Sequence, residues 1–336
     1  MYGIKSSTFD SENVFETMIF NDAEGGIENN PRVSVVMLAY NQEAYIRDAL
    51  EGVVMQQTNF PFEVYVHDDA STDNTPDIIR EFQRTYPSLI KPIFQEENQF
   101  SKGINPLTHH IYPQLKGDYI AYCEGDDFWL DPLKLQKQVD FMDSHLEYVL
   151  CCHDIEMKYE KGMAVKEVFY KKPANGNFSF AFLDEFSNHF LATASVLVRR
   201  EVAVNTPLTN NLVSIDMHAL LYFLSQGNGF YLADTMAVKR RNPGGITMNS
   251  SYREKAVDGQ YRMWKEVLVF APRQYKALIR FRIAEYQRLF LKRRSFTPEK
   301  RLSKLLCGAV MNNPFWLLGL SERYRRFLLY RIGRKS

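Results

Sequence analysis

The sequence has few cysteines and no long apolar segment, and both features narrow the classes of protein it can belong to. The four cysteines, at positions 123, 151, 152 and 307, show neither metal-site spacing nor the paired spacing of a disulfide framework. We therefore expect reduced thiols in a cytoplasmic protein. Residues 1–30 lack the basic start and apolar run of a secretory signal. The longest uncharged stretch, residues 305–321, is shorter than the roughly 20 apolar residues that span a bilayer.

The composition is that of a well-packed globular protein, with 45% hydrophobic and 14% aromatic residues. The net charge of +1 conceals an asymmetry, because residues 292–336 carry +10 and the rest of the chain −9. A basic end of this kind favours contact with an anionic surface, although a solvated helix surface has the same composition. It contains no aromatic and basic recognition motif, so we expect no nucleic-acid partner.

The first half of the chain alternates strand and helix patterns. Residues 33–39 form a near-continuous apolar run, which is typical of a buried strand in a parallel sheet. We expect strands at residues 33–39, 62–67, 90–94 and 118–123, and helices at 43–57, 75–85 and 105–116. This order predicts an α/β sheet built from crossovers, with its ligands bound beyond the carboxyl ends of the strands.

The second half is less regular. The patterns predict a helix at residues 131–144, strands at 149–153, 191–198 and 229–238, a helix at 216–226, and a hairpin or excursion within 155–180. From residue 272 onward the pattern is helical and basic. We expect a flexible leader (1–30), one large domain (31–250) and a helical basic region (251–336).

The strongest chemical signal is Glu124-Gly125-Asp126-Asp127, which follows the strand expected at 118–123. Adjacent carboxylates at the end of a buried strand repel one another unless a cation or ligand compensates them. Mg²⁺ or Mn²⁺ is commonly held by one or two carboxylates together with substrate phosphates. The cluster therefore predicts a divalent metal site, although an acidic turn without a metal would have the same composition.

Two further polar segments follow strands. Asp69 stands where it could accept a hydrogen bond from the imide N–H of a uracil or thymine base, and Tyr40 could stack its ring on the base. Residues 73–75 have the simpler role of capping the next helix. If the three strand ends converge, these side chains and the acidic cluster share one crevice.

Together the three segments resemble the family 2 glycosyltransferases, an inverting group with the GT-A fold. Residues 33–41, 68–75 and 117–132 carry the resemblance in the family's order and spacing. The match covers about residues 31–155. It implies a mixed, mostly parallel central sheet flanked by helices, a nucleotide-sugar donor that we expect to be UDP-linked, and Mg²⁺ or Mn²⁺.

The resemblance also assigns roles to individual residues. Tyr40 and Asp69 would bind the base, Asp126 the ribose or sugar, and Asp127 the metal that bridges the diphosphate. The donor-binding residues that we predict are Leu38, Tyr40, Glu43, Asp69, Asp126 and Arg241. The chain has His67 where the family often has a hydrophobic residue and Ala70 where glycine is common, and we expect neither change to abolish binding.

Inversion requires a base that takes the proton of the acceptor hydroxyl. Asp216 is our candidate, since the family's base opens a helix downstream of the metal site, although a carboxylate there could also serve as a cap. His218 and Asp184 are weaker candidates. Residues 239–247 resemble a family loop that closes over the diphosphate, in which we favour Arg241. Many relatives have histidine where this chain has Asn242, which leaves a metal or phosphate contact there in doubt.

These observations predict a metal-dependent inverting glycosyltransferase that acts on a glycan or lipid-linked acceptor in cell-surface polysaccharide synthesis. The alternative is a catalytically inactive module that binds a nucleotide sugar. Nucleotidyl transfer is disfavoured, because residues 40–43 contain no glycine, lysine or arginine to grip a triphosphate. We expect the protein in the cytoplasm, with basic helices at 272–294 and 322–334 docked on the inner face of the membrane.

Overall fold

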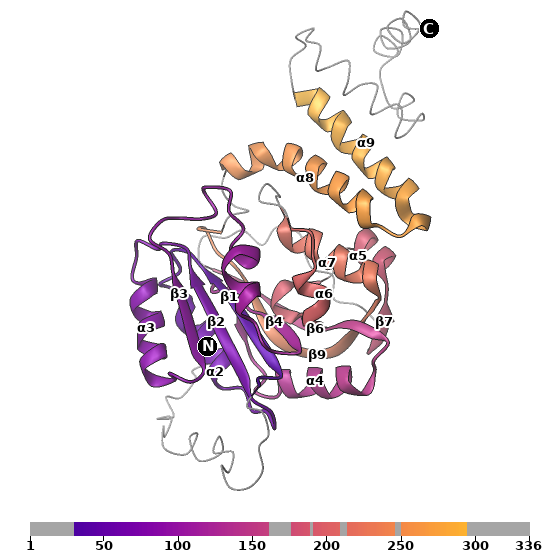
Figure 1. The fold of residues 1–336 in the computed structure, drawn as a ribbon. Coiled ribbons are helices and arrows are strands. Elements are labelled where there is room, and N and C mark those ends of the chain that lie inside the picture. The colour runs from indigo at the N-terminus through magenta and orange to yellow at the C-terminus, as the bar shows by residue number, and fades with distance from the viewer. Residues whose placement is uncertain (1–29, 161–175, 189–190, 209–213, 246–249, 294–336) are drawn as a thin grey trace, which may run out of the picture. The chain divides into compact units, whose positions relative to one another are not determined.

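The computed structural model describes residues 30–160, 176–188, 191–208, 214–245 and 250–293 (Figure 1). The strands are β1 Val33–Ala39, β2 Phe62–Asp68, β3 Ile90–Phe94, β4 Tyr119–Tyr122, β5 Phe128–Trp129, β6 Tyr148–Tyr159, β7 Phe178–Phe180, β8 Leu197–Arg199 and β9 Asn228–Arg241. The α-helices are α2 Ile46–Val54, α3 Thr75–Thr85, α4 Lys134–Ser144, α5 Phe182–Asn188, α6 Arg200–Val204, α7 Ile215–Gln226, α8 Ser250–Phe270 and α9 Lys276–Arg293. Short π or 3₁₀ turns lie at Leu107–Ile111, Tyr112–Gln114, Thr193–Ser195 and Arg273–Tyr275.

The strands form one mixed sheet in the order β3-β2-β1-β4-β8-β6-β9-β5, with β7 paired to β9. The four strands β3, β2, β1 and β4 are parallel, as the alternating pattern of the first half predicts. β8 runs antiparallel to both of its neighbours, whereas β6 and β9 form a long parallel pair. The sheet is therefore assembled from two parallel parts joined through β8.

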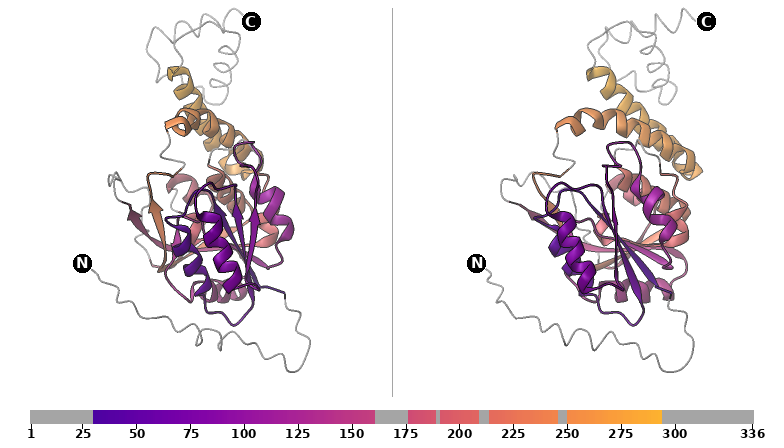
Figure 2. Two further views of the ribbon diagram at one scale, coloured as in Figure 1. Left: turned by 90° about the vertical axis from the view of Figure 1, so that its left-hand side faces the viewer. Right: turned by 60° about the vertical axis from the view of Figure 1, so that its left-hand side comes forward.

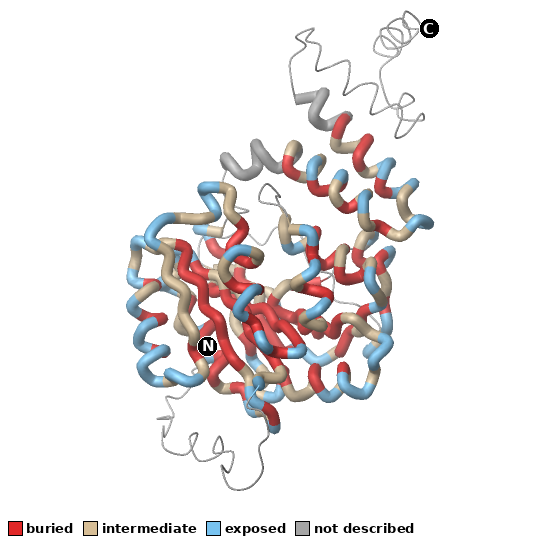
Figure 3. The backbone as a smooth tube through the Cα atoms, in the orientation of Figure 1, coloured by how far each residue is buried: buried red, intermediate tan, exposed pale blue. Residues whose placement is uncertain are grey.

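Successive side chains of a strand face opposite sides of the sheet, and each side is covered by helices. Val35 and Met37 of β1 pack in the same core cluster as Ile46 of α2, Ile79 of α3 and Leu135 of α4. Val36 lies in a second cluster, which includes Leu221 of α7, Trp264 of α8 and Ile283 of α9. Helices on both sides explain why the central strands are buried along their length (red in Figure 3).

The helix pair α8 and α9 shares a core with the sheet domain. The helices α8 and α9 lie side by side (Figure 2). Met263, Trp264 and Val267 of α8 and Ile279 of α9 are at most 3% exposed and belong to the core cluster that includes residues of α7. No helix among the described residues is long and apolar enough to cross a membrane. The expected basic helix at residues 322–334 lies outside the described residues, and a domain boundary near residue 250 stays a prediction.

Two sequence-based expectations are wrong. Residues 105–116 form a π turn and a 3₁₀ turn rather than an α-helix, because Pro113 has no N–H to donate. Within 191–198, only Leu197 and Val198 belong to a strand, β8. Residues 193–195 form a 3₁₀ turn, and the Ala194 carbonyl accepts a hydrogen bond from Trp129 Nε1 at 3.0 Å. The hairpin or excursion expected within 155–180 falls in part on residues 161–175, which lie outside the described residues, and β7 at its end pairs antiparallel with β9.

Candidate active site

Backbone hydrogen bonds join the carboxyl ends of β1, β2 and β4. The N–H of Asp69 donates to the carbonyl of Ala39 at 3.0 Å, and the N–H of Gly125 donates to the carbonyl of Leu38 at the same distance. The predicted convergence of the three strand ends is therefore confirmed. It brings Tyr40, Asp69 and the acidic cluster to one edge of the sheet.

The turn after β1 is clamped to the turn after β2. The Glu43 N–H donates to Asp73 Oδ2 at 3.0 Å, and Glu43 Oε2 accepts the N–H of Asn74 at 2.9 Å. Asp73 Oδ1 also accepts the N–H of Thr75 at 3.0 Å, as the capping interpretation of residues 73–75 predicts. The structure thus places Glu43 in a rigid frame beside Tyr40, which is 48% exposed.

Asp69 holds the loop that follows β3. Its two carboxylate oxygens accept the N–H groups of Gln99 and Phe100, at 2.7 Å and 3.1 Å, and the side chain is largely buried. Each carboxylate oxygen retains a second lone pair for a ligand. The Phe100 ring is 48% exposed at this position, and the sequence offered no motif that would have identified it.

The acidic cluster lies against β9. β5, which follows Asp127 directly, pairs antiparallel with residues 237 and 238 of β9. Asp127 Oδ1 accepts the N–H of Arg240 at 2.8 Å, and Asp127 Oδ2 forms an ion pair with Lys239 Nζ at 3.5 Å. Asp126 Oδ2 accepts a hydrogen bond from Asn242 Nδ2 at 2.9 Å. Both aspartates are therefore fixed by a strand from the second half of the chain.

The carboxylates of this cluster and Lys239 shift one another's pKa values. Burial raises the pKa of Glu124 to about 8, against the opposing effect of the Lys239 charge. Burial and the neighbouring Asp127 raise the pKa of Asp126. The Asp127 carboxylate raises the pKa of Lys239 well above its ordinary value. Lys239 is thus a fixed cation within a group of acids.

At the carboxyl end of β9, Lys239 forms an ion pair with Asp127, and Asn242, the residue after the strand, donates a hydrogen bond to Asp126. Arg241 pairs along the sheet with Tyr159. Alternation along a strand places residues 239 and 241 on the same face. The sequence offered both cations but did not indicate that Lys239 forms an ion pair with Asp127.

Asp216 lies within electrostatic reach of the cluster. It is exposed in the first turn of α7, and its charge contributes to the raised pKa values of Glu124 and Lys239. The residue before α7, Ser214, has a left-handed backbone with φ 67°, which a non-glycine residue adopts at some energetic cost. The charge of Asp216 therefore acts on Glu124 and Lys239 from the first turn of α7.

The two weaker candidates for the base have other surroundings. His218 is fully buried against the Phe270 ring at 5.2 Å, its two ring nitrogens have no hydrogen-bond partner in the described part of the chain, and burial lowers its pKa to about 4. Asp184 Oδ2 accepts the N–H of Ala181 at 2.8 Å at the start of α5. His218 therefore packs in the core, and Asp184 satisfies a backbone N–H at the start of a helix.

The cluster fits a metal that is shared with a substrate. Asp127 Oδ2 and Glu124 Oε2 are buried and lack a hydrogen-bond partner among the described residues. Within those residues, no three His, Cys, Asp or Glu side chains form a group that could hold an ion by themselves. Mg²⁺ and Mn²⁺ are commonly completed by phosphate oxygens, so one or two of these carboxylates and a diphosphate would suffice.

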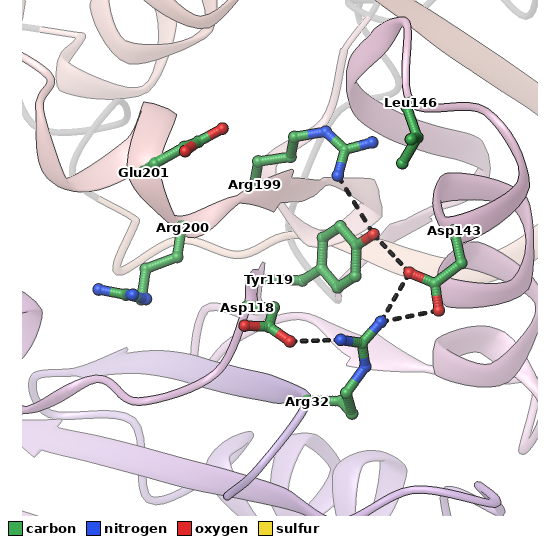
Figure 4. A pocket seen from close by; sticks show the side chains of 8 residues that line it. All are labelled: Arg32, Asp118, Tyr119, Asp143, Leu146, Arg199, Arg200 and Glu201. Carbon is green, nitrogen blue, oxygen red and sulfur yellow. Dashed lines mark hydrogen bonds and ion pairs between the residues drawn. The ribbon is translucent and has the colours of Figure 1, made fainter.

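A cavity of about 360 Å³ lies at the opposite ends of the strands (Figure 4). Arg32, just before β1, pairs with Asp118 and, at 2.6 Å, with Asp143. Tyr119 donates to Asp143 at 2.7 Å and accepts from Arg199 at 3.3 Å. Burial raises the pKa of Tyr119 to about 12, so its hydroxyl keeps its proton. In this network two arginines compensate two aspartates, and its contacts connect β1, β4, β8 and α4.

Solved structures with the same architecture have bound nucleotides. Staphylococcus aureus TarS, residues 1–349, in complex with UDP-GlcNAc aligns with a TM-score of 0.60 and 19% identity over 87% of this chain and 82% of that chain. The mannosyltransferase PcManGT from Pyrobaculum calidifontis, in complex with GDP-Man and Mn²⁺, aligns with a TM-score of 0.53 and 14% identity over 95% and 89%. These likenesses define the fold as GT-A.

The chain belongs to glycosyl transferase family 2, whose model matches residues 34–205, just over half of the sequence. An uncharacterized protein of Mycobacterium tuberculosis is 38% identical over 66% of this chain and 62% of its own length. The chain thus spans less than two thirds of that relative. TuaG of Bacillus subtilis, named for a glycosyltransferase role in teichuronic acid biosynthesis, is 26% identical over 70% of this chain and 88% of its own.

Proposed function

We propose that this chain transfers a sugar from a UDP-linked donor to a hydroxyl of a glycan or lipid-linked acceptor, with inversion at the anomeric carbon. The observation that carries the proposal is the pairing of Asp127 with Lys239 and of Asp126 with Asn242 beside the joined strand ends of a family 2 domain, with the charge of Asp216 acting on the same cluster. TarS structures with UDP and UDP-GlcNAc support a UDP-linked donor. The name of TuaG supports a role in cell-surface polysaccharide synthesis.

The donor would lie across the ends of β1, β2 and β4. Tyr40 stacks on the base, and Asp69 accepts a hydrogen bond from the imide N–H of the base. Leu38 and Glu43 line the pocket around it. Asp126 holds the ribose or sugar, and Arg241 and Lys239 face the diphosphate. Asp127 would hold Mg²⁺ or Mn²⁺, which supplies positive charge to the departing diphosphate when bound.

The transfer step needs one proton acceptor. Asp216 takes the proton of the acceptor hydroxyl as that oxygen attacks the anomeric carbon. The bond from the anomeric carbon to the phosphate oxygen breaks on the opposite face, and the nucleoside diphosphate leaves with both bonding electrons. A base at the start of α7 is also held in place by the core that buries the rest of that helix.

A donor panel tests this proposal. Hydrolysis of UDP-glucose, UDP-galactose, UDP-N-acetylglucosamine and dTDP-rhamnose is measured with Mn²⁺ and with EDTA. We expect release of nucleoside diphosphate from at least one donor with Mn²⁺ and loss of that release in EDTA. Asp127→Asn should abolish it, whereas Asp234→Asn, an exposed change on β9, should have no effect.

Asp216→Asn separates the enzyme from an inactive binding module. We expect this variant to bind the donor with unchanged affinity and to lose at least about 100-fold in turnover, as expected for a missing general base. Unchanged turnover would remove Asp216 from the mechanism. Donor binding by the wild-type chain without any turnover would favour the inactive module.

The turn between α8 and α9 supports docking on the inner face of the membrane. Val269, Leu278 and Phe281 are 75%, 43% and 50% exposed, and the basic residues Lys276 and Arg280 lie on the same helix pair. Exposed apolar side chains beside positive charges favour an anionic lipid surface. Such docking would bring the site to a lipid-linked acceptor.

Surface substitutions test docking better than a truncation, because Ile279 and Ile283 of α9 are part of the core. Val269→Ser with Phe281→Ser should reduce sedimentation with phosphatidylglycerol liposomes. Leu146→Ser, at a residue that is 76% exposed and distant from this turn in the sequence, is the matched control. Equal sedimentation of all three proteins would exclude docking through this turn.

A further inference from the structure

A second cavity, of about 220 Å³, lies among α5, α7, α8 and α9. Its volume is below the roughly 300 Å³ at which pockets for drug-sized ligands begin, so it suits a ligand of about one ring. Residues that line it include Phe186, Leu221, Gln260, Trp264, Arg282 and Tyr286. None of them belongs to the donor-binding set at the strand ends.

The cavity walls combine aromatic faces with polar groups. The rings of Phe186 and Trp264 meet edge to face, with centroids 5.4 Å apart. The Arg282 guanidinium lies 5.4 Å from the Phe186 centroid and 5.9 Å from that of Trp264. Aromatic faces carry negative partial charge and attract polarised C–H groups, while Arg and Gln bind hydroxyls. A sugar ring presents both kinds of surface.

The indole N–H of Trp264 could be satisfied by a hydrogen-bond acceptor on a ligand. Its side chain is 3% exposed, and its Nε1 donor has no partner within the described part of the structure. By contrast, Trp129 Nε1 donates to the Ala194 carbonyl. A buried donor without an acceptor loses its hydrogen bond to water and gains none in return, which destabilises the folded chain. A hydroxyl in the cavity would satisfy this donor, whereas a hydrocarbon chain would leave it unsatisfied.

The cavity reaches the first turn of α7, the helix that carries the proposed base. Met217, which follows Asp216 directly, lines it, and so does Gln260. Gln260 Nε2 donates to Ser214 Oγ at 2.8 Å, and Ser214 is the left-handed residue that introduces α7. The side chain that faces a ligand therefore also holds the turn that presents Asp216.

We propose that this cavity is the acceptor subsite, which binds one sugar ring of the acceptor beside Asp216. The assignment of the ring to the acceptor rests on the proposed function, but the binding of a sugar does not. Gln260 is then a positioning residue, because it connects the bound ring to the turn that carries the base.

The binding test uses the full chain and needs no donor. The protein has three tryptophans, so few indole N–H resonances appear in a ¹H–¹⁵N spectrum, and Trp264→Phe identifies that of Trp264. The methyl glycosides of glucose, galactose, N-acetylglucosamine and rhamnose are titrated separately. We expect a saturable shift of the Trp264 resonance with at least one glycoside, while the Trp129 resonance stays in place.

Gln260→Leu should weaken that binding about tenfold, as expected for one lost hydrogen bond. Arg262→Met is the control, because Arg262 lies on the same helix and is 55% exposed beside Asp258. Absence of any Trp264 shift in the folded wild-type chain would overturn the proposal. Glycoside shifts without hydrolysis of any donor would support the sugar site and reject the proposed transfer. Donor hydrolysis without glycoside shifts would reject the acceptor subsite alone.

Discussion

Lys239 places a positive charge where the sequence predicts a metal. Its Nζ lies 3.5 Å from Asp127 Oδ2, and its pKa is raised chiefly by that carboxylate. The ammonium therefore compensates the acids in the absence of other cations. A divalent ion at Asp127 must share or displace this ion pair, so metal affinity and the lysine are linked.

Removal of this charge should make the fold depend on metal. In EDTA, Lys239→Met should lose about 1–3 kcal/mol of unfolding free energy, because Asp127 is left buried without a counter-charge. Mn²⁺ should then raise the melting temperature of the variant more than that of the wild type. Calorimetry with and without Mn²⁺ measures both effects. Lys137→Met, at an exposed ion pair with Asp131, is the control, and an equal Mn²⁺ effect in wild type and Lys239→Met would refute the linkage.

Ala70 occupies a backbone conformation that favours glycine. Its φ is 62°, directly after Asp69, and such a conformation costs a residue with a Cβ about 1–2 kcal/mol. Ala70→Gly should therefore raise the unfolding free energy by up to about 1 kcal/mol after its greater freedom in the unfolded chain is included. Urea denaturation measures the change. Ala121→Gly in β4 should lower stability instead, and a loss in both variants would contradict the explanation.

At the scale of elements, a close backbone contact with β1 fixes the position of the amino end of β4. A Cβ added to Gly117 would lie 2.4 Å from the backbone nitrogen of Ser34, at the start of β1. The Gly117 N–H also donates to Ser34 Oγ at 2.9 Å. β1 and β4 are the strands whose opposite ends carry Tyr40 and the acidic cluster, so this contact helps to set their register.

Gly117→Ala should therefore destabilise the protein by about 1–3 kcal/mol, the usual cost of forcing atoms into a packed site. Donor affinity should fall as well, since β4 presents the acids. Gly176→Ala is the control, because its added Cβ would meet nothing within 4 Å. Thermal unfolding and UDP titration of both variants provide the measurements. Equal melting temperatures for Gly117→Ala and Gly176→Ala would show that the close contact between Gly117 and Ser34 does not contribute to stability.

Hydrophobic periodicity and helix-start signals in the sequence predicted those strands and helices whose bounds depend on neighbouring residues. The bounds of β1, β3 and α3 agree with the periodicity and with Pro76 at the start of α3. Residues 191–198 were misjudged because their apolar side chains are buried in a turn, which has no period of its own. Lys239 was undervalued because its partner, Asp127, is brought to it by the pairing of β5 with β9, and no local pattern records that pairing.

At the scale of the whole molecule, three buried imidazoles make the free energy of unfolding depend on pH. Burial lowers the pKa of His67 to about 4, of His153 to about 3 and of His218 to about 4. The unfolded chain takes up these protons near pH 6.5, so the unfolding free energy falls as the pH decreases from 6.5 toward 4. Glu124, with its pKa raised to about 8, acts in the opposite direction between pH 4.5 and 8 and offsets part of this loss.

The expected loss on going from pH 7.5 to 5.5 is about 1 kcal/mol for each buried imidazole. Urea denaturation at the two pH values measures it. His218→Phe should reduce the difference by about that amount, because the ring then has no proton to bind and remains against Phe270. His109→Phe, at an exposed position, should leave the difference unchanged. The same pH dependence in wild type and His218→Phe would exclude His218 as a source.

The distance along the chain between the acid pair and its counter-charge affects how the protein is made. The Arg240 N–H that fixes Asp127 is 113 residues further along the sequence. At about 5–20 residues per second, a ribosome needs roughly 6 to 20 s to synthesise that interval. During this time the nascent domain carries clustered carboxylates without Lys239. Asp127 therefore gains both its backbone donor and its counter-charge only after β9 has been made.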